Sequence, residues 1–194
     1  MIEVFMKKGL LIVLSGPSGV GKGTVRRQVF KDRSLNLAYS ISMTTRTPRE
    51  KEKEGIDYFF VSKDRFLDGI ASGDFLEYAV FVGNYYGTPK AYVEKLREEG
   101  KNVFLEIEVE GAKQVLARYE NDDKVVSIFL LPPSLEELEK RIRGRRSEEE
   151  AIIQERLGKA KREIDLKGNY QYTVLNDDVL RASEEIKAII HSRL

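Results

Sequence analysis

The sequence contains no cysteine and only one histidine, His191, among its 194 residues. A chain without cysteine has no disulfide framework, no thiolate nucleophile and no sulfur ligand for zinc. We assign no role to His191, because nothing in the sequence resembles a nucleophile–histidine–acid set. Thiol chemistry and triad-type hydrolysis are therefore excluded.

The sequence also lacks an excess of charge of one sign and a long apolar run. Its 33 basic and 32 acidic residues leave a net charge of +1, which excludes a protein that coats polyanions. The apolar run at residues 10–14 is too short to span a membrane and has no small-residue cleavage site behind it. We expect a cytoplasmic protein with small-molecule substrates and no membrane or nucleic-acid partner. The oligomeric state stays open.

Residues 10–24, LLIVLSGPSGVGKGT, hold the strongest functional motif. The apolar run predicts a buried strand, the glycine-rich turn lets backbone N–H groups surround an anion, and a helix is expected from Thr24. A helix N-terminus directs its dipole at negative charge. The Walker A spacing from Gly16 to Lys22 brings the lysine within reach of the β- and γ-phosphates. We predict that a nucleoside triphosphate is bound by Gly16, Pro17, Ser18, Gly19, Val20, Gly21, Lys22, Gly23 and Thr24.

One position departs from the Walker A pattern. The residue after Lys22 is Gly23, where a serine or threonine normally ligates magnesium, and Thr24 comes one place later. Direct ligation of magnesium by a loop hydroxyl is therefore in doubt. The alternative for the whole motif is a tight turn without a ligand, which the lysine in register makes the weaker interpretation.

Strands and helices alternate along the rest of the chain. We expect strands near residues 35–41, 57–61, 75–82, 103–109, 125–131 and 172–175, and helices near 63–71, 90–98, 111–119, 134–143, 149–166 and 179–194. Such alternation predicts right-handed βαβ units and a parallel sheet covered by helices on both faces. Residues 42–89 break the rhythm with strand-rich sequence, which we interpret as a small insertion that carries a second substrate.

The loop at residues 44–49, TTRTPR, places Arg46 and Arg49 among hydroxyl groups. The planar guanidinium suits phosphate, and serine or threonine hydroxyls complete such a pocket. A solvated basic loop is the alternative, but beside a P-loop we favour a second phosphate site. Tyr58 and Tyr86 could donate to the same phosphate or be ordinary half-buried strand aromatics.

Glu77 stands in the apolar sequence FLEYA, where an acid needs a partner. A carboxylate can accept two hydrogen bonds from the N1–H and the N2 amino group of guanine. Adenine offers an acceptor at N1 and no N2 amino group, so it would leave the carboxylate unpaired. From this residue alone, an ion pair with a nearby lysine is as good an interpretation.

Glu106, Glu108 and Glu110 alternate with apolar residues, which predicts three carboxylates on one strand face. Strands inside a parallel sheet are apolar on both faces, so this strand is either an exposed edge or opens into a site. We favour the site for Glu106 and Glu108, where acids could hold hydrated magnesium, and solvent for Glu110.

Five arginines crowd around the charged break at residues 144–150: Arg141, Arg143, Arg145, Arg146 and Arg156. Arginines on a closing segment stabilise the charge of a transferring phosphoryl group and help to exclude water. Glutamates lie close by in the sequence, so a salt-bridged surface helix is the alternative for about half of them.

Together these segments resemble the guanylate kinase family over essentially the whole chain. The resemblance rests on residues 15–24, 42–49, 55–58, 75–78, 83–88 and 105–111, on the pair Arg145 and Arg156, and on Asn176-Asp177. The P-loop is shared with many families, but TTRTPR (44–49) and GNYYGT (83–88) are specific.

The resemblance implies an α/β P-loop NTPase fold with a parallel central sheet flanked by helices, a small mixed α/β GMP-binding insertion and a helical lid. It implies one domain, 1–194, with a core (1–41, 90–133 and 167–194), a GMP-binding region (42–89) and a lid (about 134–166). The implied reaction is transfer of the γ-phosphoryl group of ATP to GMP with Mg²⁺, giving ADP and GDP, in purine nucleotide metabolism.

The resemblance also implies roles for individual residues. Guanine would be bound by Ser42, Glu77 and Thr88, and the GMP phosphate by Arg46, Arg49, Tyr58 and Tyr86. Arg145 and Arg156 would cover the ATP phosphates, and Asn176 and Asp177 would lie near adenine. Glu106 and Glu108 stand where many members carry aspartate; we assign both to the substrate site and Glu106 also to magnesium through water. Lys22, Arg49, Arg145 and Arg156 would stabilise the transfer.

Two other functions compete with this prediction. A non-catalytic module of the same family that binds protein partners would have a degraded phosphate loop or lid, whereas Lys22 and both lid arginines are present. A kinase for another nucleoside monophosphate, such as AMP or dTMP, is disfavoured by Glu77 together with Ser42.

Overall fold

The computed structural model describes residues 7–144 and 149–194. Its larger sheet has five strands in the order β2-β7-β1-β8-β9, all of them parallel. These strands are β1 (Leu11–Ser15), β2 (Leu37–Tyr39), β7 (Asn102–Glu106), β8 (Val125–Leu131) and β9 (Tyr172–Leu175). The predicted parallel sheet is therefore confirmed, with β1 at its centre.

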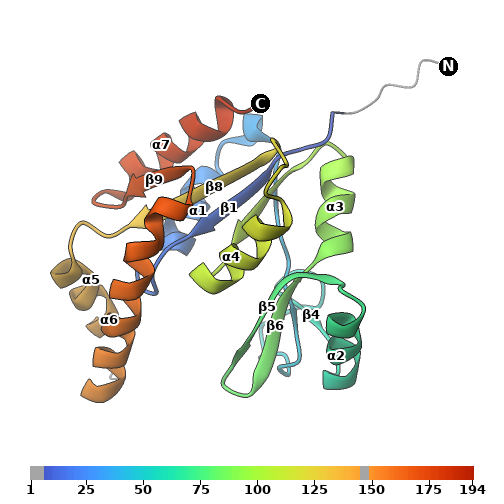
Figure 1. The fold of residues 1–194 in the computed structure, drawn as a ribbon, viewed down its shortest axis with the longest axis horizontal. Helices are drawn as coiled ribbons and strands as arrows, with labels where there is room; N and C mark the ends of the chain where they lie inside the picture. Colours follow the sequence, from blue (N-terminus) through green and yellow to red (C-terminus); the bar gives the residue numbers. More distant parts are fainter. Residues whose placement is uncertain (1–6, 145–148) are drawn as a thin grey trace.

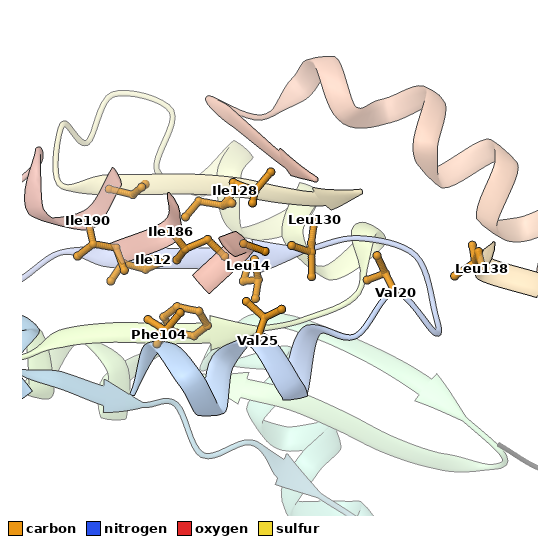
Figure 2. Close-up of a cluster of buried hydrophobic side chains, with 14 of the residues drawn as sticks. Ile12, Leu14, Val20, Val25, Phe104, Ile128, Leu130, Leu138, Ile186 and Ile190 are labelled. Atoms are coloured by element: carbon orange, nitrogen blue, oxygen red, sulfur yellow. The ribbon is translucent and has the colours of Figure 1, made fainter. Parts of the chain in front are cut away.

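The central strand β1 is apolar because it is buried on both faces. Ile12 and Leu14 point into one apolar cluster with Val25, Phe104 and Ile186 (Figure 2). Leu11 and Val13 point into a second cluster on the other face. Alternation along a strand thus supplies both cores from one five-residue segment.

Helices cover each face of this sheet. The first face, shown in Figure 2, is covered by α1 (Lys22–Val29) and α7 (Val179–His191), and the second by α3 (Lys90–Glu98) and α4 (Val109–Arg118). Short 3-10 segments, η1 (Arg33–Leu35) and η2 (Leu166–Asn169), complete the connections. The result is a three-layer α/β/α core.

Two additions extend from the end of this core that lies away from the chain termini (Figure 1). One is a four-stranded sheet, order β4-β3-β6-β5, with α2 (Lys63–Ala71) beside it. Its strands are β3 (Met43–Thr44), β4 (Phe59–Phe60), β5 (Phe75–Phe81) and β6 (Asn84–Pro89). The other is the helix pair α5 (Leu135–Arg143) and α6 (Glu150–Asp165).

The structure corrects the expected strand at residues 103–109. Strand β7 ends at Glu106, and α4 begins at Val109 with Glu108 as its N-cap residue and Glu110 in its first turn. The three glutamates therefore do not share a strand face. Acidic side chains are favourable at a helix N-terminus, and this preference prevails over the period-two pattern.

Other boundaries shift for local reasons. Strand β6 was not expected, because its sequence contains Gly87 and Pro89, residues that are depleted in strands. The expected strand at 35–41 shrinks to β2, because Asn36 adopts a left-handed conformation with φ 44°. Helix α1 starts at Lys22, before the expected Thr24. Within the described residues, no helix is both long and apolar enough to cross a bilayer.

Candidate functional site

The loop between β1 and α1 follows the carboxyl end of the central strand, where parallel sheets bind ligands. Gly16, Gly19 and Gly21 have φ values of 145°, 86° and 103°, a region that side chains rarely adopt. A Cβ on Gly16 would lie 2.4 Å from the carbonyl oxygen of Leu130. Helix α1 has no side-chain N-cap hydrogen bond and no acid in its first turn, so no side chain competes with an anion at its N-terminus.

Lys22 folds back over this loop. Its Nζ donates to the carbonyl oxygens of Gly16 at 2.5 Å and Pro17 at 3.2 Å. Burial lowers the pKa of Lys22, while the nearby carboxylates of Glu106, Glu108 and Glu163 act in the opposite direction. The lysine is thus a desolvated cation held ready at a concave backbone surface.

The loop is held in place from behind by Asn176 and Arg141. Asn176 is buried, and its Nδ2 donates to the Val20 carbonyl oxygen at 2.8 Å. Arg141 of α5 reaches the same oxygen at 3.3 Å and the Asn176 carbonyl at 3.2 Å. Asp177 instead points to solvent and pairs with Arg181 at 2.7 Å. A contact of Asn176 and Asp177 with adenine stays a prediction.

Glu106 lies at the end of β7, beside the phosphate loop. Its Oε2 accepts from Arg26 Nε at 2.7 Å, and Arg26 in turn stacks on Tyr39 with 4.1 Å from Cζ to the ring centroid. A Cβ on Gly23 would lie 3.3 Å from Glu106 Oε1. Gly23 therefore gives the carboxylate close access to the loop, which is a physical reason for glycine at this departure from the Walker A pattern.

Glu108 links the loop region to helix α6. Its Oε2 lies 2.8 Å from Lys159 Nζ, and the same ammonium lies 3.6 Å from Glu163 Oε1. Burial raises the pKa of Glu163, whose other oxygen has no hydrogen-bond partner among the described residues. One charge cluster therefore lies around the cleft, made of two ammonium groups (Lys22 and Lys159) and three carboxylates (Glu106, Glu108 and Glu163).

A second group of candidate residues lies on the smaller sheet. Arg46 Nη2 donates to both carboxylate oxygens of Glu52, at 2.8 and 2.9 Å, and its Cζ lies 5.5 Å from the Tyr58 ring centroid. The Tyr58 and Tyr86 rings meet edge to face at 6.1 Å. Glu52 also accepts from the backbone N–H of Arg49. The predicted phosphate residues Arg46, Tyr58 and Tyr86 are thus neighbours, with Glu52 ordering the arginine loop.

Glu77 and Thr88 form a buried pair on β5 and β6. Thr88 Oγ1 donates to Glu77 Oε1 at 2.6 Å, and Glu77 is 8% exposed. Burial raises the pKa of Glu77 although the hydrogen bonds from Thr88 lower it, and Glu108 adds to the rise. Among residues 7–144 and 149–194, no lysine or arginine forms an ion pair with Glu77, so the alternative interpretation is not supported there. Ser42 directly precedes β3, and its carbonyl oxygen accepts from Phe59 N–H.

The helix pair α5 and α6 carries the predicted lid arginines. Arg156 Nη2 donates to Ser18 Oγ of the phosphate loop at 2.9 Å. Arg143 pairs with Glu139 and Glu150, both at 2.6 Å, so the surface interpretation holds for this residue. Arg145 and Arg146 lie outside the described residues.

A cleft of about 210 Å³ lies next to the phosphate loop and is lined by Ser18, Gly19, Gly21, Lys22, Gly23, Glu106, Ile107 and Glu108. No set of three or more His, Cys, Asp or Glu side chains in the described part of the chain is arranged to hold a metal by itself. Mg²⁺ in phosphoryl-transfer sites needs only one or two carboxylates, with water and substrate phosphates as its other ligands. Glu106 fits that requirement, because one of its oxygens faces the loop.

Sequence reasoning missed four residues that orient this site: Arg26, Glu52, Lys159 and Glu163. All four are charged residues in charged surroundings, where composition favours solvent. One signal existed for Glu163, since it continues the buried stripe of Ile153, Leu157 and Ala160 along α6. A carboxylate at a stripe position indicates a buried charge.

Comparisons with known proteins show the family to which the chain is similar. The family model described as guanylate kinase matches residues 8–193. A guanylate kinase of Bacillus cereus is 56% identical over 184 residues, which cover 95% of this chain and 88% of the relative. A guanylate kinase of Mesoplasma florum is 55% identical over 183 residues, and the chain spans only 61% of that relative's length.

A solved structure of a guanylate kinase also resembles this chain. The crystal structure of guanylate kinase from Anaplasma phagocytophilum is similar with a TM-score of 0.73 and 33% sequence identity, over 96% of this chain and 86% of that one. The match spans both the core with its phosphate loop and the smaller sheet with Glu77. The chain belongs to the guanylate kinase family.

Proposed function

We propose that this protein transfers the γ-phosphoryl group of ATP to GMP and releases ADP and GDP. The observation that carries the proposal is the buried Glu77–Thr88 pair together with a complete phosphate loop, whose cleft is lined by Glu108. Glu108 connects the two, since its charge acts on both Lys22 and Glu77. A donor and an acceptor nucleotide would meet between them.

Guanine selection would come from Glu77. An ionised carboxylate can accept from guanine N1–H and N2–H₂, while Thr88 donates to its other side. Adenine would leave this buried charge unpaired, which strongly disfavours AMP. Ser42 would complete the base pocket.

The GMP phosphate would bind at Arg46, Arg49, Tyr58 and Tyr86. Arg46 Nη2 already donates to both oxygens of the Glu52 carboxylate, an anion of the kind that a phosphate would replace. A bound phosphate would share or replace this contact, and the adjacent tyrosine hydroxyls could donate to it.

The ATP phosphates would lie in the loop of residues 16–24, with Lys22 exchanging its contacts to Gly16 and Pro17 for phosphate oxygens. Arg156 of α6 contacts the same loop at Ser18. Together with Arg145 and Arg49, it would stabilise charge on the transferring group. In-line transfer needs no protein nucleophile, so position and charge supply most of the acceleration.

Mg²⁺ would be held by Glu106 through water, with Thr24 nearby. When bound, it would neutralise the charge that develops on the transferring phosphoryl group. We also propose that the enzyme works on free nucleotides of the cytoplasmic purine pool, without nucleic-acid or membrane partners; its oligomeric state is a separate question.

The direct test is a coupled assay of ADP release with ATP and Mg²⁺, comparing GMP, AMP, dTMP and UMP as acceptors. We expect rapid turnover with GMP alone. Turnover with AMP or dTMP would identify a different monophosphate kinase. Binding of GMP without turnover, measured by calorimetry, would instead support the non-catalytic module.

A further inference from the structure

Helix α4 holds the edge of the smaller sheet through one side chain, Gln114. Its Oε1 accepts from the backbone N–H of Tyr78 at 3.2 Å, and its Nε2 donates to the Tyr78 carbonyl at 3.1 Å. Strand β5 is the edge strand of its sheet, with β6 as its only strand neighbour among the described residues. Gln114 thus pairs with the free backbone edge as a further strand would.

This contact falls where β5 leaves the core. Phe75, Leu76 and Glu77 are buried, whereas Tyr78 and the residues after it are exposed. Leu76 packs in the apolar cluster that contains Ala112 and Val115 of α4. The register between β5 and β6 shifts between Phe75 and Glu77, and such a bulge lets Leu76 and Glu77 both turn toward α4.

Glu77 reaches α4 at Gly111, one helical turn before Gln114. A Cβ on Gly111 would lie 2.8 Å from Glu77 Oε2 and 3.3 Å from its carboxyl carbon. Any side chain at this position would displace the carboxylate or the helix. Gly111 and Gln114 lie three residues apart, on one face of the helix.

We propose that Gly111 and Gln114 are positioning residues that set the place of the Glu77 carboxylate and thereby the selectivity for guanine. The inference rests on the proposed function, because it concerns the same base pocket. Gly111 leaves the space that the carboxylate occupies, Gln114 fixes the backbone next to it, and Thr88 holds its other oxygen. A base edge read by two hydrogen bonds is sensitive to small displacements of its acceptor.

The first experiment compares Gln114→Met with Lys113→Met. The methionine keeps the length of Gln114 without its hydrogen bonds, and Lys113 is an exposed neighbour on the same helix. Steady-state kinetics would be measured with GMP and with inosine monophosphate, which lacks the N2 amino group. Because each lost hydrogen bond to the exposed edge is weak, we expect Gln114→Met to raise the KM for GMP by roughly three- to tenfold. We also expect it to reduce the preference for GMP over inosine monophosphate. The KM for ATP should not change, and Lys113→Met should behave as the wild type.

A second set of variants tests whether the effect runs through Glu77. Gly111→Ala should cause a larger loss of the same selectivity, and Gln114→Met should add little in a Glu77→Gln background. An equal effect of Gln114→Met on GMP, inosine monophosphate and ATP, or additivity with Glu77→Gln, would overturn the inference. Absence of GMP-dependent turnover in the wild type would overturn the proposed function instead.

Discussion

At the level of single residues, the site holds a buried carboxylate, Glu77, and a partly buried ammonium group, Lys22. Glu77 is buried with a hydroxyl as its hydrogen-bond partner, and Lys22 is desolvated above the phosphate loop. Burying a charged group of this kind lowers the free energy of unfolding, but it leaves the group ready to bind a ligand. Variants of Glu77 and of Gly21 in the phosphate loop test this balance between stability and binding.

Glu77→Gln should separate stability from binding. Burial raises the pKa of Glu77 in the folded protein, so ionising this carboxylate lowers the free energy of unfolding. The stability is fully present below the unfolded pKa and is lost as the pH rises through the folded pKa. At pH 8 we therefore expect the melting temperature of the variant to be equal to or above that of the wild type. The KM for GMP should rise by roughly 100-fold, because the amide cannot accept both guanine hydrogen bonds. Calorimetric melting and GMP kinetics together check this, and a lower melting temperature would contradict it.

Gly21→Ala should damage the phosphate loop. The backbone at Gly21 has φ 103°, and a Cβ would lie 2.7 Å from Asn176 Nδ2, the group that supports Val20. Backbone strain of about 1–2 kcal/mol would add to this clash, and the KM for ATP should rise at least tenfold. Gly73→Ala is the matched control, since Gly73 also has positive φ but no atom within 4 Å of its Cβ. That variant should lose some stability and leave the KM for ATP unchanged.

At the scale of elements, helix α6 combines packing and charge along one stripe. Ile153, Leu157 and Ala160 join the main apolar cluster, and the next buried position is Glu163. Lys159 on the same helix bridges to Glu108 near the cleft. The helix is thus attached to the core by apolar contacts and to the site by one ammonium group.

Glu163→Gln should stabilise the protein in a pH-dependent manner. Because burial raises the pKa of Glu163, its favourable contribution exists below the unfolded pKa of about 4.3 and is lost as the pH rises through the folded value. A neutral amide avoids that loss, so the difference in unfolding free energy should grow with pH and reach about 1 kcal/mol at pH 8. Denaturant titrations of both proteins between pH 5 and 8 test it, and a constant difference would refute the assignment.

At the level of the whole molecule, one end of the central sheet carries the candidate site and the other end stabilises the fold. The phosphate loop follows the carboxyl end of β1, while a buried charge network lies at the opposite end, before Leu11. There Arg97, fully buried, donates to Glu94 at 3.0 Å, Asp122 at 2.9 Å and the Gly9 carbonyl at 3.1 Å. This network ties helix α3 to the start of the sheet.

Glu94→Gln should destabilise the fold without impairing turnover. Burial alone would raise the pKa of Glu94, but hydrogen bonds from Lys8, Tyr119 and Arg97 lower it to about 2. The stabilisation is present above the unfolded pKa and is lost as the pH falls toward about 2. We expect a loss of about 2 kcal/mol at pH 7 that shrinks below pH 4, measured by denaturant titration. Glu99→Gln, which touches only an exposed ion pair of 4.0 Å with Lys95, should change stability very little.

The parallel sheet, the phosphate loop and the family could all be predicted from the amino-acid sequence. Those features depend on local patterns: an apolar strand, glycines at fixed spacing, and alternating strands and helices. The same reasoning correctly singled out Glu77 as a carboxylate in an apolar strand, but it left the choice between a base contact and an ion pair open.

The pairing of charged side chains, in contrast, depends on how the chain folds in three dimensions. Arg26 pairs with Glu106 across 80 positions of sequence, and Lys159 pairs with Glu108 across 51. Charged residues carry no periodic signal that predicts such partners, because their partners are set by the packing of helices on the sheet. For the same reason, the sequence does not show that Glu77 of β5 packs against Gly111 of α4, or that Gln114 binds the next strand residue. These contacts depend on the packing of β5 beside α4.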